Sequence, residues 1–275
     1  MMIDRELIKR ALAEDLDGGQ DITSVATVSG TERVVADFTA RKAGVLAGVD
    51  MARATCEEVG LTDIAVLIQD GSPVKPGDVI MTVRGDTRAI LLAERTALNF
   101  LGHLGGIATL TRTWVDAIAG TKCEIRDTRK TTPGMRQLEK YAVRMGGGTN
   151  HRMSLSDAAL IKDNHIAAAG GVTQAFSKVR TQFPQSEIEI EVDNLDQLRE
   201  VLPLKPDLVL LDNMSPERCR DAVALVNGAT KLEASGGISL ENAAAYAATG
   251  VNYLAIGALT HSAPVLDIGL DLRAE

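Results

Sequence analysis

Seven cationic residues lie between Ile125 and Arg152, although the protein as a whole is acidic. The chain has 275 residues, with 29 Lys and Arg against 37 Asp and Glu, which gives a formal net charge of −8. Proteins that bind nucleic acids or membrane surfaces usually carry a broad basic face, so neither class of partner is expected. The local excess of positive charge predicts instead a site for a small anionic ligand. The cations are Arg126, Arg129, Lys130, Arg136, Lys140, Arg144 and Arg152.

These cations differ in their local setting. Arg129 and Lys130 follow the end of a strand-like segment, whereas the three cations after Pro133 recur at helical spacing and could line one helix face. His151 and Arg152 come after three successive glycines, which either let the backbone approach a ligand or form a flexible connector. His151 is a candidate general base. Alternatively, it could only orient another group through a hydrogen bond.

Further candidates lie where strand-like segments end in the second half of the chain. The segments end near Asp127, Asp163, Val192, Asp212, Ser235 and Gly257. They alternate with helical stretches, which predicts right-handed β-α-β units and a parallel sheet or barrel. The compact spacing of the last three favours a closed or nearly closed β/α barrel. In such barrels the chemistry lies at the carboxyl ends of the strands, so we expect these polar residues to converge.

Three charged side chains occupy such strand ends. Lys162 could bind a phosphate, form a Schiff base as in barrel aldolases, or make a structural ion pair. Glu191 and Asp212 could bind ribose hydroxyls and Mg²⁺. Alternatively, they are acids at strand ends that are simply solvated.

Two glycine-containing turns follow the last two predicted strands. Backbone N–H groups in such turns commonly bind phosphate, although the glycines could equally serve only to make tight turns. The candidate phosphate-binding residues are Ser235, Gly236, Gly237, Gly257 and Ala258.

The first half of the chain is expected to form a separate sheet-containing domain. After an amphipathic helix near the N-terminus, short β-rich pieces are separated by Gly, Pro and Asp. Helical spacing then runs from Thr87 to Leu104, and a second helical stretch follows Gly105 and Gly106, where we place the domain boundary. The three cysteines form no C-x-x-C pair, the N-terminus has no apolar signal region, and no segment approaches a membrane span. A cytoplasmic protein is expected.

Several blocks of the sequence closely resemble the quinolinate phosphoribosyltransferase family, type II phosphoribosyltransferases also called carboxylating nicotinate-nucleotide pyrophosphorylases. The matching blocks extend from about Glu14 to Leu272. The block that begins at Arg126 with "RDTRKTTPGMR" is highly specific. Two slight departures are "EVDNL", where many relatives have a Glu-Val-Glu type segment, and Asn252, which replaces a frequent Asp. The longer blocks are "RDTRKTTPGMRQLEKYAVRMGGGTNHR", "ERTALNFLGHLGGIAT", "LIKDNHI", "LLDNM", "EASGGI" and "YLAIGALTHSAPVLDIGLDL".

The resemblance implies transfer of phosphoribosyl from phosphoribosyl pyrophosphate to quinolinate, with decarboxylation, in de novo NAD synthesis. The products are nicotinate mononucleotide, pyrophosphate and CO₂. Mg²⁺ is expected. No organic cofactor is expected, because once the ring nitrogen is ribosylated the cationic pyridinium stabilises the electron pair that CO₂ leaves on the adjacent ring carbon. An acidic protein needs a locally positive site for such anionic substrates, which accounts for the cationic run.

The resemblance also assigns residue roles. Arg95, Arg129 and Arg152 should bind the quinolinate carboxylates, supported by Thr128, Lys130 and His151. Lys162 should contact the pyrophosphate. Glu191 and Asp212 should bind the ribose or Mg²⁺. The two glycine turns, the second of which includes Ile256, should bind the 5′-phosphate. The residues expected to be catalytic are Lys130, His151, Lys162, Glu191 and Asp212.

The implied fold is α/β, with an N-terminal α/β sandwich over residues 1–105 and an incomplete β/α (TIM-like) barrel over residues 106–265. The tail, residues 266–275, should return to the first domain. Arg95 is expected to reach a neighbouring subunit's site, so a homodimer with shared active sites is the minimum assembly. The alternatives are a phosphoribosyltransferase for a different acid, a non-catalytic sensor of phosphoribosyl pyrophosphate, and the Schiff-base aldolase.

Overall fold

The computed structural model describes residues 3–274, so that Met1, Met2 and Glu275 lie outside the described residues. Residue contacts divide the chain into two compact units that alternate along the sequence. The first unit comprises Met1–Arg112, Gln137–Gly147 and Ser262–Glu275. The second unit comprises Thr113–Arg136 and Gly148–His261. The protein is α/β, as the sequence predicted, while the boundary expected near residue 105 stays a prediction.

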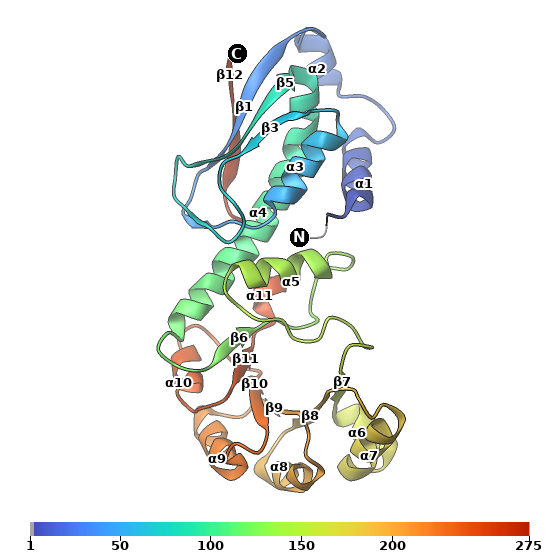
Figure 1. The fold of residues 1–275 in the computed structure, drawn as a ribbon, viewed down its shortest axis with the longest axis vertical. Helices are drawn as coiled ribbons and strands as arrows, with labels where there is room; N and C mark the ends of the chain where they lie inside the picture. Colours follow the sequence, from blue (N-terminus) through green and yellow to red (C-terminus); the bar gives the residue numbers. More distant parts are fainter. Residues whose placement is uncertain (1–2, 275) are drawn as a thin grey trace. The chain divides into compact units, whose positions relative to one another are not determined.

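An antiparallel sheet with the strand order β12-β1-β5-β3 forms the centre of the first unit (Figure 1). The C-terminal strand β12 pairs along β1, with Phe38 opposite Leu270, so the end of the chain joins a sheet built by its beginning. The strands are β1 (Arg33–Ala40), β3 (Asp63–Val66), β5 (Val79–Asp86) and β12 (Ile268–Ala274). A short ribbon of β2 (Gly44–Val45) and β4 (Pro73–Val74) accompanies them.

Apolar side chains of this sheet pack against α3 (Val49–Glu58) and α4 (Thr87–Ala117). Phe38 and Met81 of the sheet, together with Ala52 and Leu101 of the helices, are almost completely buried. Each strand alternates its side chains between two faces, so one face can supply this layer. The result is a two-layer α/β arrangement with an apolar core.

Helix α4 is a single helix, whereas the sequence predicted two helical stretches interrupted at Gly105 and Gly106. The two glycines serve close packing instead of a break. A Cβ on Gly106 would lie 2.1 Å from the carbonyl oxygen of Pro264, and one on Gly105 would lie 2.9 Å from Leu266 Cδ2. Glycine is therefore required here by the chain segment that crosses α4 before β12.

The second unit contains a six-stranded parallel sheet with the order β6-β11-β10-β9-β8-β7. Within the described residues β6 and β7 are its two edges, so the sheet is an open one; a complete barrel of this type has eight strands. This agrees with the incomplete barrel implied by the resemblance. The strands are β6 (Glu124–Arg126), β7 (Ala159–Ile161), β8 (Ile188–Val192), β9 (Leu208–Asp212), β10 (Lys231–Ser235) and β11 (Tyr253–Ala255).

Helices follow the strands of the second unit and pack against the sheet. Helices α7 and α8 contact β8, α10 contacts β11, and α9 contacts both α8 and α10. Side-chain caps help to fix where they start, since Asn194 accepts two backbone N–H groups at α8 and Ser215 accepts one at α9. The helices are α7 (Val172–Gln182), α8 (Leu195–Val201), α9 (Pro216–Val226) and α10 (Ala243–Ala247).

The remaining helices are shorter or lie nearer the chain ends. The first unit has α1 (Arg5–Leu16) and α2 (Ile22–Thr27), and nearly all of α5 (Arg136–Met145) belongs to it. The second unit has α6 (Asp163–Ala169), α11 (Ala258–His261) and the 3₁₀ turn η1 (Leu202–Leu204). Across residues 3–274, every helix is too short or too polar to cross a bilayer.

Candidate functional site

A cavity of about 590 Å³ lies in the second unit, at the carboxyl ends of the parallel strands. With one exception, Arg95, all the residues that the sequence singled out for the site line this cavity. They are Thr128, Arg129, Lys130, His151, Arg152, Lys162, Glu191, Asp212, Ser235, Gly236, Gly237, Ile256, Gly257 and Ala258. The volume falls in the range typical of small-molecule sites.

Two guanidinium groups give the cavity its positive side. Burial, followed by the neighbouring charge of Arg129, lowers the pKa of Arg152. Nε of Arg129 is buried and has no hydrogen-bond partner within residues 3–274. Two partly buried cations that repel each other, one with an unsatisfied donor, are costly to hold together without an anion. The arrangement therefore suits a ligand with carboxylate or phosphate groups.

The loop that carries Arg152 is fixed by hydrogen bonds to the first strand of the sheet. The backbone N–H of His151 donates to Asp127 Oδ1 at 2.8 Å, and Asn150 Nδ2 donates to Asp127 Oδ2 at 2.5 Å. Asp127 is completely buried directly after β6. Arg152 Nη1 donates to the carbonyl oxygen of Ala158 at 2.8 Å. Hydrogen bonds thus hold both the loop that precedes Arg152 and the guanidinium of Arg152.

The cavity lining also includes an ion pair and a further acid. Lys162 Nζ, at the end of β7, pairs with Glu191 Oε2 on β8. An ion pair requires the protonated ammonium, which is not a nucleophile, so this contact disfavours the Schiff-base alternative for Lys162. Asp212, at the end of β9, accepts a hydrogen bond from Asn213 Nδ2 at 2.7 Å.

The first of the two glycine turns has a backbone conformation that other residues rarely adopt, whereas the glycine of the second turn is closely packed. Gly236 and Gly237 have φ angles of +86° and +64°. A Cβ on Gly236 would lie 2.2 Å from Asn213 Oδ1, and one on Gly257 would lie 3.0 Å from Lys130 Cδ. Tight turns alone would account for these glycines, but both turns also line the cavity, which keeps the phosphate hypothesis open.

Arg95 lies elsewhere. It is exposed on α4 in the first unit, beside a hollow that Leu98, Asn99 and His103 also line. The cavity of the second unit therefore lacks this predicted carboxylate ligand within the described single chain.

The cations of helix α5 also take no part in the cavity lining. Lys140 is completely buried in the first unit, and Arg144 lies 5.6 Å from the Tyr141 ring. Gly146 does not approach a ligand: a Cβ there would lie 2.3 Å from the carbonyl oxygen of Ala108 on α4. The cationic run thus divides, with Arg129, Lys130 and Arg152 at the cavity and the helical cations apart from it.

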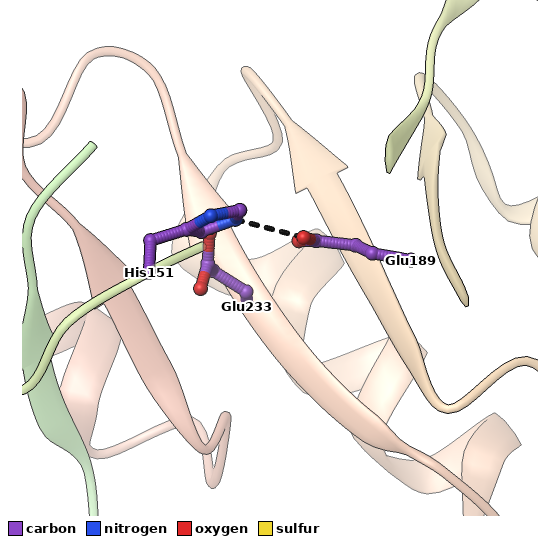
Figure 2. A group of neighbouring side chains, drawn as sticks. All are labelled: His151, Glu189 and Glu233. Carbon is purple, nitrogen blue, oxygen red and sulfur yellow. Dashed lines mark ion pairs between the residues drawn. The ribbon is translucent and has the colours of Figure 1, made fainter. Parts of the chain in front are cut away.

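The sequence reasoning missed two buried glutamates, Glu233, which lines the cavity, and Glu189, which contacts the cavity residue His151. His151 Nε2 lies 2.8 Å from Glu189 Oε2 and 3.5 Å from Glu233 Oε1 (Figure 2). Strand alternation would have found both, because Glu189 and Glu233 lie two residues before Glu191 and Ser235 and share their faces. Asn213 and His261 also line the cavity and were likewise not predicted.

Glu233 is held in an unusual electrostatic setting. Burial, and then the charge of Glu189, raise the pKa of Glu233 to about 7, while His151 and Arg126 act in the opposite direction. Arg126 Nη1 donates to Glu233 Oε2 at 2.9 Å, and its guanidinium lies 4.1 Å from the centre of the Tyr253 ring. Burial acts to lower the pKa of the Arg126 guanidinium, but the combined effect of Glu233, Glu189 and Tyr253 raises it overall.

Two sets of side chains have donor atoms suited to a cation. Glu191 and Asp212 offer carboxylate oxygens inside the cavity, the kind of ligand that Mg²⁺ prefers. His151, Glu189 and Glu233 offer one ligand atom each, all within 4.8 Å of one another.

Comparison with known proteins identifies the two parts of the sequence. Residues 21–105 match the model of the quinolinate phosphoribosyl transferase N-terminal domain, and residues 107–271 match that of the C-terminal domain. The chain is 52% identical to the carboxylating nicotinate-nucleotide pyrophosphorylase of Mycobacterium leprae, over 98% of this chain and 96% of the relative. It is 41% identical to the probable enzyme of the same name from Bacillus subtilis, over 98% and 93%.

The fold agrees with solved structures of such proteins. The crystal structure of the nicotinate-nucleotide pyrophosphorylase from Ehrlichia chaffeensis superposes with a TM-score of 0.94 at 39% identity. The match covers 99% of this chain and 100% of that one. The similarity therefore extends over both units.

Proposed function

The chain belongs to the quinolinate phosphoribosyl transferase family, and from that premise we propose that it converts quinolinate and phosphoribosyl pyrophosphate into nicotinate mononucleotide, pyrophosphate and CO₂ in de novo NAD synthesis. One observation carries the proposal: a single cavity is lined both by the cations Arg129 and Arg152 and by the acids Glu191 and Asp212. Anionic groups and a developing positive charge would each find complementary partners there.

The two guanidinium groups bind the quinolinate carboxylates. Their planar fork geometry fits a carboxylate with two parallel hydrogen bonds, and the unsatisfied Nε of Arg129 gains a partner. Binding both carboxylates fixes the orientation of the ring, so that its nitrogen faces the anomeric carbon of the ribose. Lys130 and Thr128 complete this side of the pocket, where the Lys130 N–H donates to Thr128 Oγ1 at 3.0 Å.

Ribosyl transfer then forms the N–C bond as the bond from the anomeric carbon to pyrophosphate breaks. The sugar carries positive charge in the transition state, which Glu191 and Asp212 stabilise. The Lys162 ammonium donates a hydrogen bond to the departing pyrophosphate, so that a phosphate oxygen replaces its present partner Glu191. The backbone N–H groups of the two glycine turns bind the 5′-phosphate.

Glu191 and Asp212 also have the chemistry to hold Mg²⁺. Both line the cavity, and the pairing of Glu191 with the Lys162 ammonium supports a role for this acid in binding a cation. When bound, the ion would neutralise pyrophosphate charge.

Decarboxylation follows from the same positioning. After transfer the ring nitrogen is a cationic pyridinium, so the electron pair left by CO₂ stays on the adjacent ring carbon until that carbon takes up a proton. No organic cofactor is needed for this step.

Arg95 supplies the third carboxylate ligand from a neighbouring subunit. Its exposure on α4 and its absence from the described cavity of its own chain support this arrangement, which makes a homodimer the minimum assembly. Mixing inactive Arg95→Ala and Arg129→Ala proteins should restore activity, because each mixed dimer contains one intact site. No recovery, with mixed dimers demonstrated by mass, would contradict the shared site.

Two parallel assays test the reaction. One contains quinolinate, phosphoribosyl pyrophosphate and Mg²⁺, and the other has nicotinate in place of quinolinate. Nicotinate mononucleotide and CO₂ are expected from quinolinate alone. Product from nicotinate alone would assign a different acid substrate, and binding of phosphoribosyl pyrophosphate without any product would assign a sensor.

We also propose a cytoplasmic location for the protein, which fractionation of cells would test.

A further inference from the structure

The ring of His151 is held by a donor that fixes its protonation pattern. The backbone N–H of Arg152 donates to His151 Nδ1 at 2.8 Å. An amide N–H can only donate, so Nδ1 must hold a lone pair and the ring proton must be on Nε2. This tautomer follows from the geometry of the loop itself.

The Nε2–H group faces two acids. Glu189 Oε2 lies at 2.8 Å and accepts this proton, while Glu233 Oε1 lies farther away, at 3.5 Å. Figure 2 shows the three side chains pointing toward one another, with the glutamates on strands and His151 on the loop. Glu233 is fixed in turn by Arg126, which is stacked on Tyr253. Both ring nitrogens of His151 are therefore engaged by the protein.

The same three residues resemble a metal site, but the Arg152 amide argues against one. A metal on Nε2 would displace the proton to Nδ1 in a neutral ring. Nδ1–H would then face the N–H of Arg152, donor against donor, at a contact of 2.8 Å. The guanidinium of Arg126 beside Glu233 would also repel a cation. The geometry is consistent with a proton at this position.

We propose that Glu189 and Glu233 are positioning residues that hold His151 as its neutral Nε2–H tautomer, so that the ring fixes the backbone of Arg152 for carboxylate binding and does not exchange protons with the substrate. The part concerning carboxylate binding rests on the function proposed above. His151 is then the orienting residue that the sequence left as the alternative to a general base.

The tautomer is tested by NMR of protein labelled with ¹⁵N at histidine. The chain has 4 histidines, and the His151 signals can be assigned with a His151→Gln variant. Near neutral pH we expect one protonated and one unprotonated ring nitrogen, with the proton on Nε2. A proton on Nδ1, or on both nitrogens, would overturn the proposal. Zn²⁺ is then added alone; unchanged His151 signals are expected, and saturable loss of the Nε2 proton would establish a metal site instead.

The positioning role is tested by two substitutions of one residue. Glu189→Leu removes the acceptor, whereas Glu189→Gln keeps an amide oxygen that can accept the Nε2 proton. We expect the leucine variant to raise KM for quinolinate by about tenfold, the value of one hydrogen bond, with kcat changed by less than about threefold. The glutamine variant should keep both the wild-type KM and the Nε2–H signal.

The matched control is Glu187→Leu, an exposed acid immediately before β8. It should leave KM unchanged. A fall in kcat with an unchanged KM in Glu189→Leu would restore His151 as a proton carrier and overturn the proposal. If that variant does not fold, the wild-type tautomer still decides the question. The NMR result needs no substrate, so it is independent of whether quinolinate is the acid used.

Discussion

The two sheets of the molecule place their charges in opposite ways. In the antiparallel sheet the buried face is apolar, and ion pairs such as Arg41 with Asp271 are exposed. In the parallel sheet Glu189 and Glu233 are buried at the cavity, with Arg126 and His151 as partners. Apolar packing stabilises a sheet without desolvating charge, whereas buried ion pairs give little net stability. The charges of the second sheet are therefore better explained by the site above them than by folding.

The largest effect is expected from the apolar core of the first sheet. Phe38→Ala removes a completely buried aromatic side chain and should lower the free energy of unfolding by about 3–5 kcal/mol. Denaturant unfolding followed by circular dichroism measures it. The folded fraction should keep the wild-type kcat/KM. A proportionate loss of activity in fully folded protein would mean that the two sheets are not separate in role.

The corresponding change in the cavity should act on activity alone. Arg129→Ala removes charge-assisted hydrogen bonds worth about 3–4 kcal/mol, so kcat/KM for quinolinate should fall by about 10²- to 10³-fold. Steady-state kinetics and a thermal melt distinguish activity from stability. Arg199→Ala, at an exposed pair with Asp196, serves as the control and should leave kcat/KM unchanged. Equal losses in both variants would remove the special role of Arg129.

The buried acid should make stability depend on pH. Because the pKa of Glu233 is raised to about 7 from an ordinary 4.5, the folded protein keeps a proton that the unfolded chain releases across this interval. Stability contributed by this group therefore falls as the pH rises, by at most about 1.4 kcal/mol per pH unit. Glu233→Gln has no such proton, so the difference in unfolding free energy, wild type minus variant, should decline over that interval. A flat or rising difference would contradict the raised pKa.

The smallest effect is expected at the surface of the first sheet. Arg41→Ala breaks an ion pair whose side chains are 40% and 51% exposed. Such pairs contribute less than about 1 kcal/mol, and salt weakens them further. Unfolding at low and high salt should give nearly the same free energy for variant and wild type. A loss of several kcal/mol would show that surface charge matters to this sheet.

The sequence predicted the ends of the parallel strands well. Val192, Asp212 and Ser235 are the last residues of β8, β9 and β10, because strands of apolar residues followed by a polar turn have a clear local pattern. Asp212 and Ser235 consequently lie together at the cavity, with Glu191, which immediately precedes Val192. Local pattern sufficed wherever the site depends on strand ends alone.

What the sequence did not predict depends on contacts distant along the chain. Gly106 and Gly146 are glycines because Pro264 and Ala108 lie against them, which no local pattern reveals. Helix α4 was therefore predicted as two helical stretches, and the triple glycine was interpreted as either a close approach to a ligand or a flexible connector, whereas Gly146 packs against Ala108. Strand alternation places Glu189 on the same face as Glu191, but its role could not be predicted, because its partner His151 is brought to it only by the fold.

A crystal structure of the protein with quinolinate bound would test the central claim most directly. The account predicts the ligand in the cavity of the second unit, with its carboxylates on Arg129 and Arg152 and its ring nitrogen directed toward Glu191 and Asp212. Quinolinate bound outside this cavity, or with neither carboxylate on those arginines, would contradict it.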